Sequence, residues 1–311
     1  MEELTQSLDA FGPWDWACVA LHLLSAFIGI YALKCWHNLP GKASAPTTLI
    51  SDAVMGLCTG LLAFGIIFGV ATQMVMQSFS THFGISQAHL FTAAFSGQLA
   101  AAATMLGMGA AAPRTLDWAP CVETDESKLE GSPLRQAVGA FSVPRVLLGL
   151  LSIFALGLAA TLVWKGFHVA WEQLFLRGWT GQPPADEPQE IVDAVLKTDV
   201  DTWRFFTIAL AVTIGAPIME ELAFRGMIYP GLRRLGAASA THGRWIAVCI
   251  TGALFSAAHL SPSAALPLFA FGAFMCLVRD RYGLLTCMAI HCCFNGWNLV
   301  WLKLAPNAST L

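Results

Sequence analysis

The chain has 311 residues, of which 56% are hydrophobic and only 12% are charged. Soluble domains carry about a quarter charged residues, so the composition excludes an ordinary soluble domain, and the mean hydropathy of +0.61 agrees with a membrane protein. The net charge of -3 gives no basic surface, and no nucleic-acid partner is expected. The nine cysteines form no CxxC pair, so neither a disulfide framework nor a thiolate zinc site is indicated.

The N-terminal segment from Met1 to Asp15 carries four acidic residues and no lysine or arginine. A removable signal peptide needs a basic segment before its apolar run. We therefore expect the first apolar run to remain in the protein as a membrane span.

The apolar runs predict an all-α, polytopic bundle. A helix needs about 20 mostly apolar residues to cross a bilayer, and about eight segments qualify. The sixth is expected to extend toward the preceding loop, through residues 237–241. The polar loop Gln173–Asp201 is expected to hold a short helix over Glu190–Lys197, and the loop Pro113–Val143 to be irregular. In chain order the spans are Ala17–Trp36, Ala53–Met76, His89–Ala111, Arg145–Val163, Phe205–Ile218, Trp245–Leu260, Ala264–Val278 and Gly283–Leu302.

Basic residues follow the first, third, fifth and seventh spans, whereas the loops after the second and sixth contain none. The loop after the fifth span is assigned Arg225, Arg233, Arg234 and Arg244. Apart from the long polar loop before the fifth span, this alternation predicts cytoplasmic basic loops and both termini outside. We expect an integral protein of the cell (inner) membrane, in contact with the lipid bilayer.

Glycines recur at a spacing that lets membrane helices approach closely. Gly56 stands four residues before Gly60, and Gly65 four residues before Gly69. Small residues at this spacing favour close contact between helices in a bilayer. Both pairs are therefore expected at helix contacts.

Ionisable side chains inside apolar spans are costly and are candidates for function. Residues four apart share a helix face, so Glu221 is expected to pair with Arg225, while Glu220, about 100° around the helix, points inward. By the same spacing, Phe255 is expected to stack along the same face as His259, and His291 shares a face with Asn295. One cavity can therefore receive a carboxylate, two imidazoles and an amide. The residues concerned are Glu220, Glu221, Arg225, Phe255, His259, His291 and Asn295.

These side chains suit hydrolysis of an acyl bond. A carboxylate and a histidine can bind and deprotonate a water molecule, and a second histidine with an amide can stabilise an oxyanion. Alone, a Glu–Arg pair is often a helix-end anchor, and a membrane histidine is often a packing residue. Their occurrence together, in this order, favours catalysis.

Three motifs, Pro217-x-x-Glu-Glu-x-x-x-Arg-Gly, Phe255-x-x-x-His and His291-x-x-x-Asn, resemble those of a known family. It is the CAAX prenyl endopeptidase and bacteriocin-processing family of intramembrane proteases, related to the Ras-converting prenyl endopeptidase. The resemblance covers about residues 204–304. It implies that Glu220 and His259 activate the water, that His291 and Asn295 form the oxyanion pocket, and that Glu221, Arg225 and Phe255 support them.

The resemblance implies an intramembrane endopeptidase with its catalytic membrane core in residues 201–311. Residues 1–200 then form an N-terminal membrane region of about four spans and a polar loop. The substrate is expected to be a peptide or a membrane protein, prenylated or not. No cofactor is expected, because the chain has no HExxH motif and Asn295 is a poor zinc ligand. A zinc-dependent alternative would use Glu220, His259 and His291 as ligands.

Two other functions are compatible with the same residues. One is a non-catalytic immunity or scaffold protein of this fold, and the other is a proton-coupled transporter using Glu220 and the histidines. The complete set of four polar residues favours an enzyme over a scaffold. The N-terminal half shows no paired half-repeats or broken helix, which argues against a transporter.

Overall fold

The computed structural model describes residues 50–83, 87–112, 115–118, 203–236, 240–262 and 264–304, together with residues 12, 13, 16, 17, 20, 167 and 171. Every regular element in these ranges is helical, which agrees with the all-α prediction. The expected span at 145–163, the loop helix at 190–197 and almost all of the span at 17–36 lie outside the described residues. The count of eight spans therefore stays a prediction.

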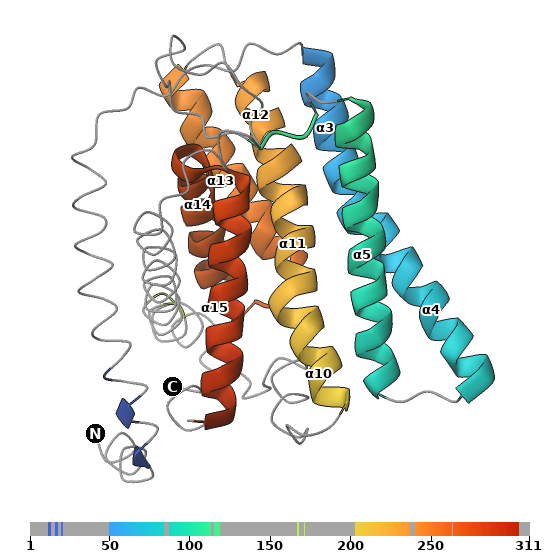
Figure 1. Cartoon of the computed structure of the whole chain (residues 1–311). Coiled ribbons are helices and arrows are strands. Elements are labelled where there is room, and N and C mark those ends of the chain that lie inside the picture. Colours follow the sequence, from blue (N-terminus) through green and yellow to red (C-terminus); the bar gives the residue numbers. More distant parts are fainter. Residues whose placement is uncertain are drawn as a thin grey trace, which may run out of the picture.

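The first described helices form a bent rod and its antiparallel neighbour. Helix α3 (Ile50–Leu62) continues through the π-helical turn η1 (Ala63–Ile67) into α4 (Phe68–Phe83), and α5 (Gln87–Ala111) runs back beside it (Figure 1). The segment Ser51–Ser78 is long and apolar enough to cross a membrane. These helices occupy the second and third expected spans.

A second continuous rod runs through the middle of the bundle. It comprises α10 (Trp203–Leu210), the π-helical turn η4 (Ala211–Gly215), α11 (Ala216–Glu221), the π-helical turn η5 (Leu222–Ile228) and α12 (Tyr229–Leu235). The whole of Trp203–Leu235 is long and apolar enough to cross a membrane. Glu220 and Glu221 therefore lie in the interior of a long helix rather than at its end.

The expected end of the fifth span at Ile218 is wrong. The charges beyond it were assigned to a loop, but Arg225, Arg233 and Arg234 are buried residues of the rod. Each forms an ion pair with a carboxylate, so the helix continues past them without leaving unpaired charge. Because these three arginines are not loop charges, they cannot be counted toward orientation. The placement of both termini outside stays a prediction.

Three further helices complete the described core: α13 (Ala240–Ala258), α14 (Ala265–Tyr282) and α15 (Leu284–Leu304). Helix α13 begins before Trp245, as expected. Helices α14 and α15 meet at Gly283, whose φ of 82° lies in the left-handed region that glycine adopts at little steric cost. The seventh and eighth expected spans agree with these helices to within a few residues.

Helix α11 lies between α5 and α15, and α4 leans away from this core along the outer side of α5 (Figure 1). The main apolar cluster surrounds α11 and η5, and it draws on α5, α13, α14 and α15. The central rod is therefore packed on several sides by other described helices. Members of this cluster include Met105, Met219, Leu222, Phe224, Met227, Phe255, Phe271, Met275 and Ile290.

One of the two predicted glycine contacts is observed. A β-carbon at Gly56 would lie 2.7 Å from the carbonyl oxygen of Thr115, and one at Gly60 would lie 3.1 Å from that of Ala223. Gly65 and Gly69 have no such neighbour within 4 Å among the residues that the structure describes, so that contact is not confirmed. The π-helical turn η1 begins after Gly60 and before Gly65. Such a turn changes the direction in which the following residues point, so the second glycine pair does not continue the face of the first.

We predict that Gly56→Ala lowers the thermal unfolding midpoint in detergent, followed by tryptophan fluorescence. The added methyl group would press on a backbone carbonyl that cannot rotate away, and overpacking of this kind costs about 1–3 kcal/mol. The control is Gly69→Ala, an open helical site where alanine is favoured by up to about 1 kcal/mol. Equal midpoints for the two variants would contradict the close contact at Gly56.

Candidate functional site

A buried ion pair lies at the junction of α11 and η5. Glu221 is the last residue of α11, and Arg225 follows it by four positions in η5. Arg225 Nη1 donates to Glu221 Oε1 at 2.9 Å, and neither side chain is exposed to solvent. The predicted Glu221–Arg225 pair is therefore present in the structure.

The Arg225 guanidinium also joins the central rod to α13 and α14. Its Nη2 donates to the carbonyl oxygen of Gly272 at 3.0 Å. Its Cζ lies 4.6 Å from the ring centroid of Phe255, a distance at which a cation is attracted to an aromatic face. Gly272 also permits close packing of α14 on α13, because a β-carbon there would stand 3.0 Å from the Cα of Gly252. Arg225 thus links three helical segments.

His291 of α15 lies against the same carboxylate. Its Nδ1 is 2.8 Å from Glu221 Oε1, and its Nε2 is 3.9 Å from Glu220 Oε2. An ionised carboxylate only accepts hydrogen bonds. His291 Nδ1 is therefore the donor of this hydrogen bond, and Glu221 is the acceptor. The second ring nitrogen is thereby turned toward Glu220, which is the arrangement by which a carboxylate orients a catalytic histidine.

Glu220 is buried, with 8% of its surface exposed. Its Oε2 receives no hydrogen bond from any residue in the described ranges. The 3.9 Å between Glu220 Oε2 and His291 Nε2 is too long for a direct hydrogen bond. Glu220 and His291 are therefore brought together around one position in the bundle.

His259 contacts Phe255, whose ring also lies near His291. It follows the C-terminal end of α13, is exposed, and donates from Nδ1 to the carbonyl oxygen of Phe255 at 2.8 Å. The Phe255 ring centroid is 4.7 Å from that of His259 and 6.1 Å from that of His291. The expected stacking of Phe255 with His259 is thus present, and the same ring also lies near His291.

Asn295 lies one helical turn beyond His291 and is half-buried. Its Nδ2 donates to the carbonyl oxygen of Val212 at 2.8 Å. Val212 belongs to the π-helical turn η4, and such turns disturb the regular backbone pairing and are frequent at functional sites. The amide carries two N–H groups, so this bond engages one of its two donors. The side chain therefore ties α15 to the central rod close to His291.

The zinc-dependent alternative requires three ligands around one ion. In the described part of the chain, no three His, Cys, Asp or Glu side chains form such a group. Glu220 Oε2 and His291 Nε2 lie 3.9 Å apart, whereas His259 contacts the Phe255 ring and donates from Nδ1 to the Phe255 carbonyl oxygen. As arranged, Glu220, His259 and His291 do not fit a zinc site. Metal independence itself stays a prediction.

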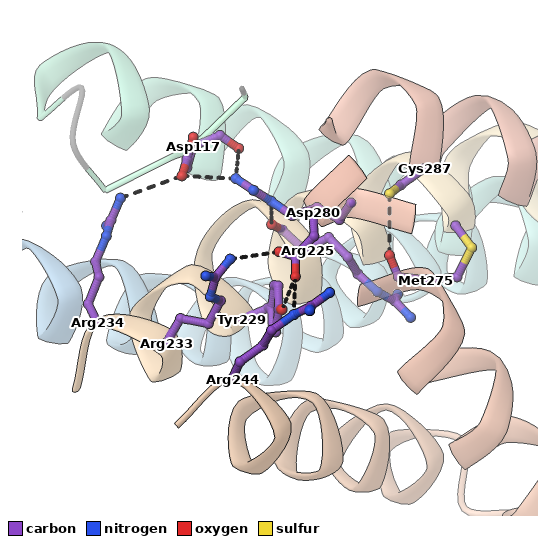
Figure 2. Close-up of polar contacts among 10 residues, drawn as sticks. Asp117, Arg225, Tyr229, Arg233, Arg234, Arg244, Met275, Asp280 and Cys287 are labelled. Atoms are coloured by element: carbon purple, nitrogen blue, oxygen red, sulfur yellow. Dashed lines mark hydrogen bonds and ion pairs between the residues drawn. The ribbon is translucent and has the colours of Figure 1, made fainter. Parts of the chain in front are cut away.

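A second polar cluster, not expected from the sequence, lies farther along the rod (Figure 2). Asp280 of α14 accepts hydrogen bonds from Tyr229 at 2.9 Å, Arg233 at 2.8 Å and Arg244 at 2.8 Å. The four-residue spacing of Arg225, Tyr229 and Arg233 places them along one helix face. The four-residue spacing could have predicted this shared face. The fifth span is expected from the sequence to end at Ile218, however, so the predicted helix does not extend to these residues.

Asp117 forms the other half of this cluster. It lies in the short segment 115–118 that follows α5, and its carboxylate is 2.9 Å from Arg279 Nη2 and 3.7 Å from Arg234 Nη2 (Figure 2). Asp117 was expected in an irregular loop without a role. Nothing in its local sequence indicates that two buried arginines, more than a hundred residues away, lie against it.

The described chain combines two helices long and apolar enough to cross a membrane with a buried Glu–Glu–Arg–His cluster inside the bundle. Residues 202–297 match the family model described as type II CAAX prenyl endopeptidase Rce1-like. This range contains all three motifs, so the resemblance seen in the sequence is confirmed for this segment. No curated protein and no solved structure matches the chain. The match and the apolar helices together indicate an integral membrane protein whose residues 202–297 are similar to type II CAAX prenyl endopeptidases.

We predict that Glu221→Gln and Arg225→Met each reduce the free energy of unfolding by roughly 3–5 kcal/mol, because each leaves a buried charge without its partner. The double variant should be more stable than either single one. Arg244→Met is the control, since its pair with Asp280 is 28% exposed at the arginine and is expected to contribute about 0–1 kcal/mol. Denaturant titration of the purified proteins measures all four. Single variants as stable as Arg244→Met would contradict the assignment of the central pair.

Proposed function

We propose that the chain is an intramembrane endopeptidase that hydrolyses a peptide bond with a water molecule activated by Glu220. One observation carries this proposal: Glu220 Oε2 lies 3.9 Å from His291 Nε2. The other ring nitrogen of His291, Nδ1, is bound by Glu221. The site is buried among apolar side chains, where electrostatic interactions are stronger than in water. The family match over residues 202–297 supports the same class of reaction.

In the proposed reaction, Glu220 and His259 bind the water, and Glu220 accepts one of its protons. The oxygen of the water adds to the carbonyl carbon of the scissile peptide, and the carbonyl oxygen becomes an oxyanion. The C–N bond then breaks, and Glu220 returns the proton to the leaving amine nitrogen. A positioned general base of this kind contributes about 10²–10⁴ in rate.

We assign stabilisation of the oxyanion to His291 and Asn295. His291 donates from Nε2 when its ring is doubly protonated, and the Glu221 carboxylate at Nδ1 stabilises that positive charge. Asn295 donates from the N–H that does not bind Val212. The two residues are one turn apart on α15, so both donors can reach one oxygen atom.

The proposed mechanism uses no metal ion, because Asn295 is a poor zinc ligand and a suitable oxyanion donor. The proposed substrate is a peptide or membrane-protein segment, prenylated or not, that reaches the site from the bilayer. Because the cluster is surrounded by apolar helices, a substrate with apolar flanking residues would be compatible with its surroundings.

Quantitative analysis of protein N-termini in membranes from cells expressing the wild type or Glu220→Gln tests the function. We expect new N-termini that depend on the wild type and are lost with Glu220→Gln, at equal levels of folded protein. Asp52→Asn, in the first turn of α3, is the control for replacing a carboxylate outside the site and should retain cleavage. Identical N-termini for the wild type and Glu220→Gln would overturn the proposal and favour the non-catalytic scaffold.

With a substrate identified, we predict that Asn295→Ala lowers kcat by about 10²–10³, as expected for loss of one oxyanion donor. KM should change little, because the interaction strengthens only in the transition state. Asn298→Ala is a matched control on α15, since Asn298 also donates to a backbone carbonyl, that of Phe294, at 2.8 Å. It should keep kcat near the wild-type value.

The metal question is decided by Asn295→Asp and a chelator. We predict that Asn295→Asp is at least as damaging as Asn295→Ala, because a negative charge would face the oxyanion, and that the wild type keeps its activity in the chelator. A zinc enzyme would show the opposite pattern. An active Asn295→Asp variant that loses its activity on chelation would contradict the proposed mechanism.

A further inference from the structure

The segment Thr115–Trp118, here called the strap, connects the candidate site to a part of the chain outside the matched range 202–297. Its backbone bonds in two directions. The N–H of Asp117 donates to the carbonyl oxygen of Gly226 at 3.0 Å, and the carbonyl oxygen of Trp118 accepts from the N–H of Leu284 at 3.2 Å. The strap therefore bridges η5 of the central rod and the start of α15.

The strap forms backbone hydrogen bonds with Gly226 and Leu284, two residues at which the helical backbone hydrogen bonding is irregular or incomplete. Gly226 lies inside the π-helical turn η5, and Leu284 is the first residue of α15, whose N–H has no acceptor within its own helix. Gly226 also keeps the space that Leu116 occupies, because a β-carbon there would meet the Leu116 side chain at 2.6 Å. The strap thus packs directly on the turn that carries Arg225.

The Asp117 side chain reaches the turn a second time, through Arg279. Asp117 Oδ2 is 2.9 Å from Arg279 Nη2, which also donates to the Asp117 carbonyl oxygen at 3.3 Å. Arg279 is fully buried, and its Nε donates to the carbonyl oxygen of Arg225 at 3.1 Å. Two carbonyl groups of η5, those of Arg225 and Gly226, are therefore held by Asp117 and its ion-pair partner.

A continuous set of contacts then runs to the site. The backbone of Arg225 is held by Arg279, and its guanidinium binds Glu221 at 2.9 Å. Glu221 in turn lies 2.8 Å from His291 Nδ1. We propose that Asp117 is a positioning residue of the peptidase, acting through Arg279 and Arg225 to hold the Glu221–His291 pair opposite Glu220. This inference rests on the proposed function.

Asp280 is a matched control within the same cluster. It is adjacent to Arg279 in sequence and receives three donors at 2.8–2.9 Å (Figure 2). Those donors come from α12 and α13 rather than from η5. Removal of the Asp280 charge disturbs an ion-pair network of comparable size and leaves the contacts from Asp117 to Arg225 in place.

The test compares Asp117→Asn, Asp117→Glu and Asp280→Asn on the identified substrate. Misplacement of catalytic groups by a distant change can cost up to about 10²-fold in rate. We expect Asp117→Asn to lower kcat about 10- to 100-fold with KM within about twofold, and Asp117→Glu to recover most of the loss. Asp280→Asn should lower the unfolding midpoint while leaving kcat of the folded protein within about threefold of wild type. Equal kcat losses for Asp117→Asn and Asp280→Asn, or none for Asp117→Asn, would overturn the proposal.

A double-mutant cycle separates this inference from the proposed function. Asp117→Asn and Glu221→Gln should be non-additive in unfolding midpoint because Arg279 and Arg225 connect the two carboxylates. Asp280→Asn and Glu221→Gln should be additive. This readout needs no substrate. If the wild type cleaves no faster than Glu220→Gln, the proposed function fails. Additive effects of Asp117→Asn and Glu221→Gln would instead refute the coupling between the strap and the site.

Discussion

The carboxylate of Glu221 accepts hydrogen bonds from Arg225 at 2.9 Å and from His291 at 2.8 Å, in a region where the Glu221 and Arg225 side chains have no exposed surface. A single buried charge would cost several kcal/mol, and the guanidinium and imidazole partners offset that cost. The same contacts join η5 to α15, while Arg225 reaches α14 through Gly272. The same contacts anchor the backbone next to Glu220, one residue before Glu221, so the candidate site depends on this ion pair.

The support for that pair extends beyond the segment that matches the family model. Asp117 and the strap follow α5, outside residues 202–297, yet they bind the backbone of η5 directly and through Arg279. Helix α3 packs closely on the same region, since Gly60 would clash with Ala223 if it carried a side chain. The matched segment is thus one part of a larger packed unit, and the N-terminal half contributes residues that position the site.

Local spacing was sufficient to predict the Glu221–Arg225 pair and the stacking of Phe255 on His259, because both are four-residue contacts on one helix. It could not predict that the rod continues to Leu235. The charges of Arg233 and Arg234 are paired with Asp280 and Asp117, which are remote in sequence. The bond from Asn295 to Val212 and the contact between His291 and Glu221 likewise depend on helix packing. Sequence therefore indicated the residues of the site, and tertiary structure determined their partners.

The central claim is that Glu221 fixes His291 opposite Glu220 so that the two flank a scissile peptide. The most direct measurement is an experimental structure of Glu220→Gln with an uncleaved substrate peptide. The account predicts a peptide carbonyl oxygen at about 2.7–3.1 Å from His291 Nε2 and Asn295 Nδ2, with its carbon facing residue 220 and His291 Nδ1 still bound to Glu221. A peptide bound elsewhere, or a metal ion held by residue 220, His259 and His291, would contradict it.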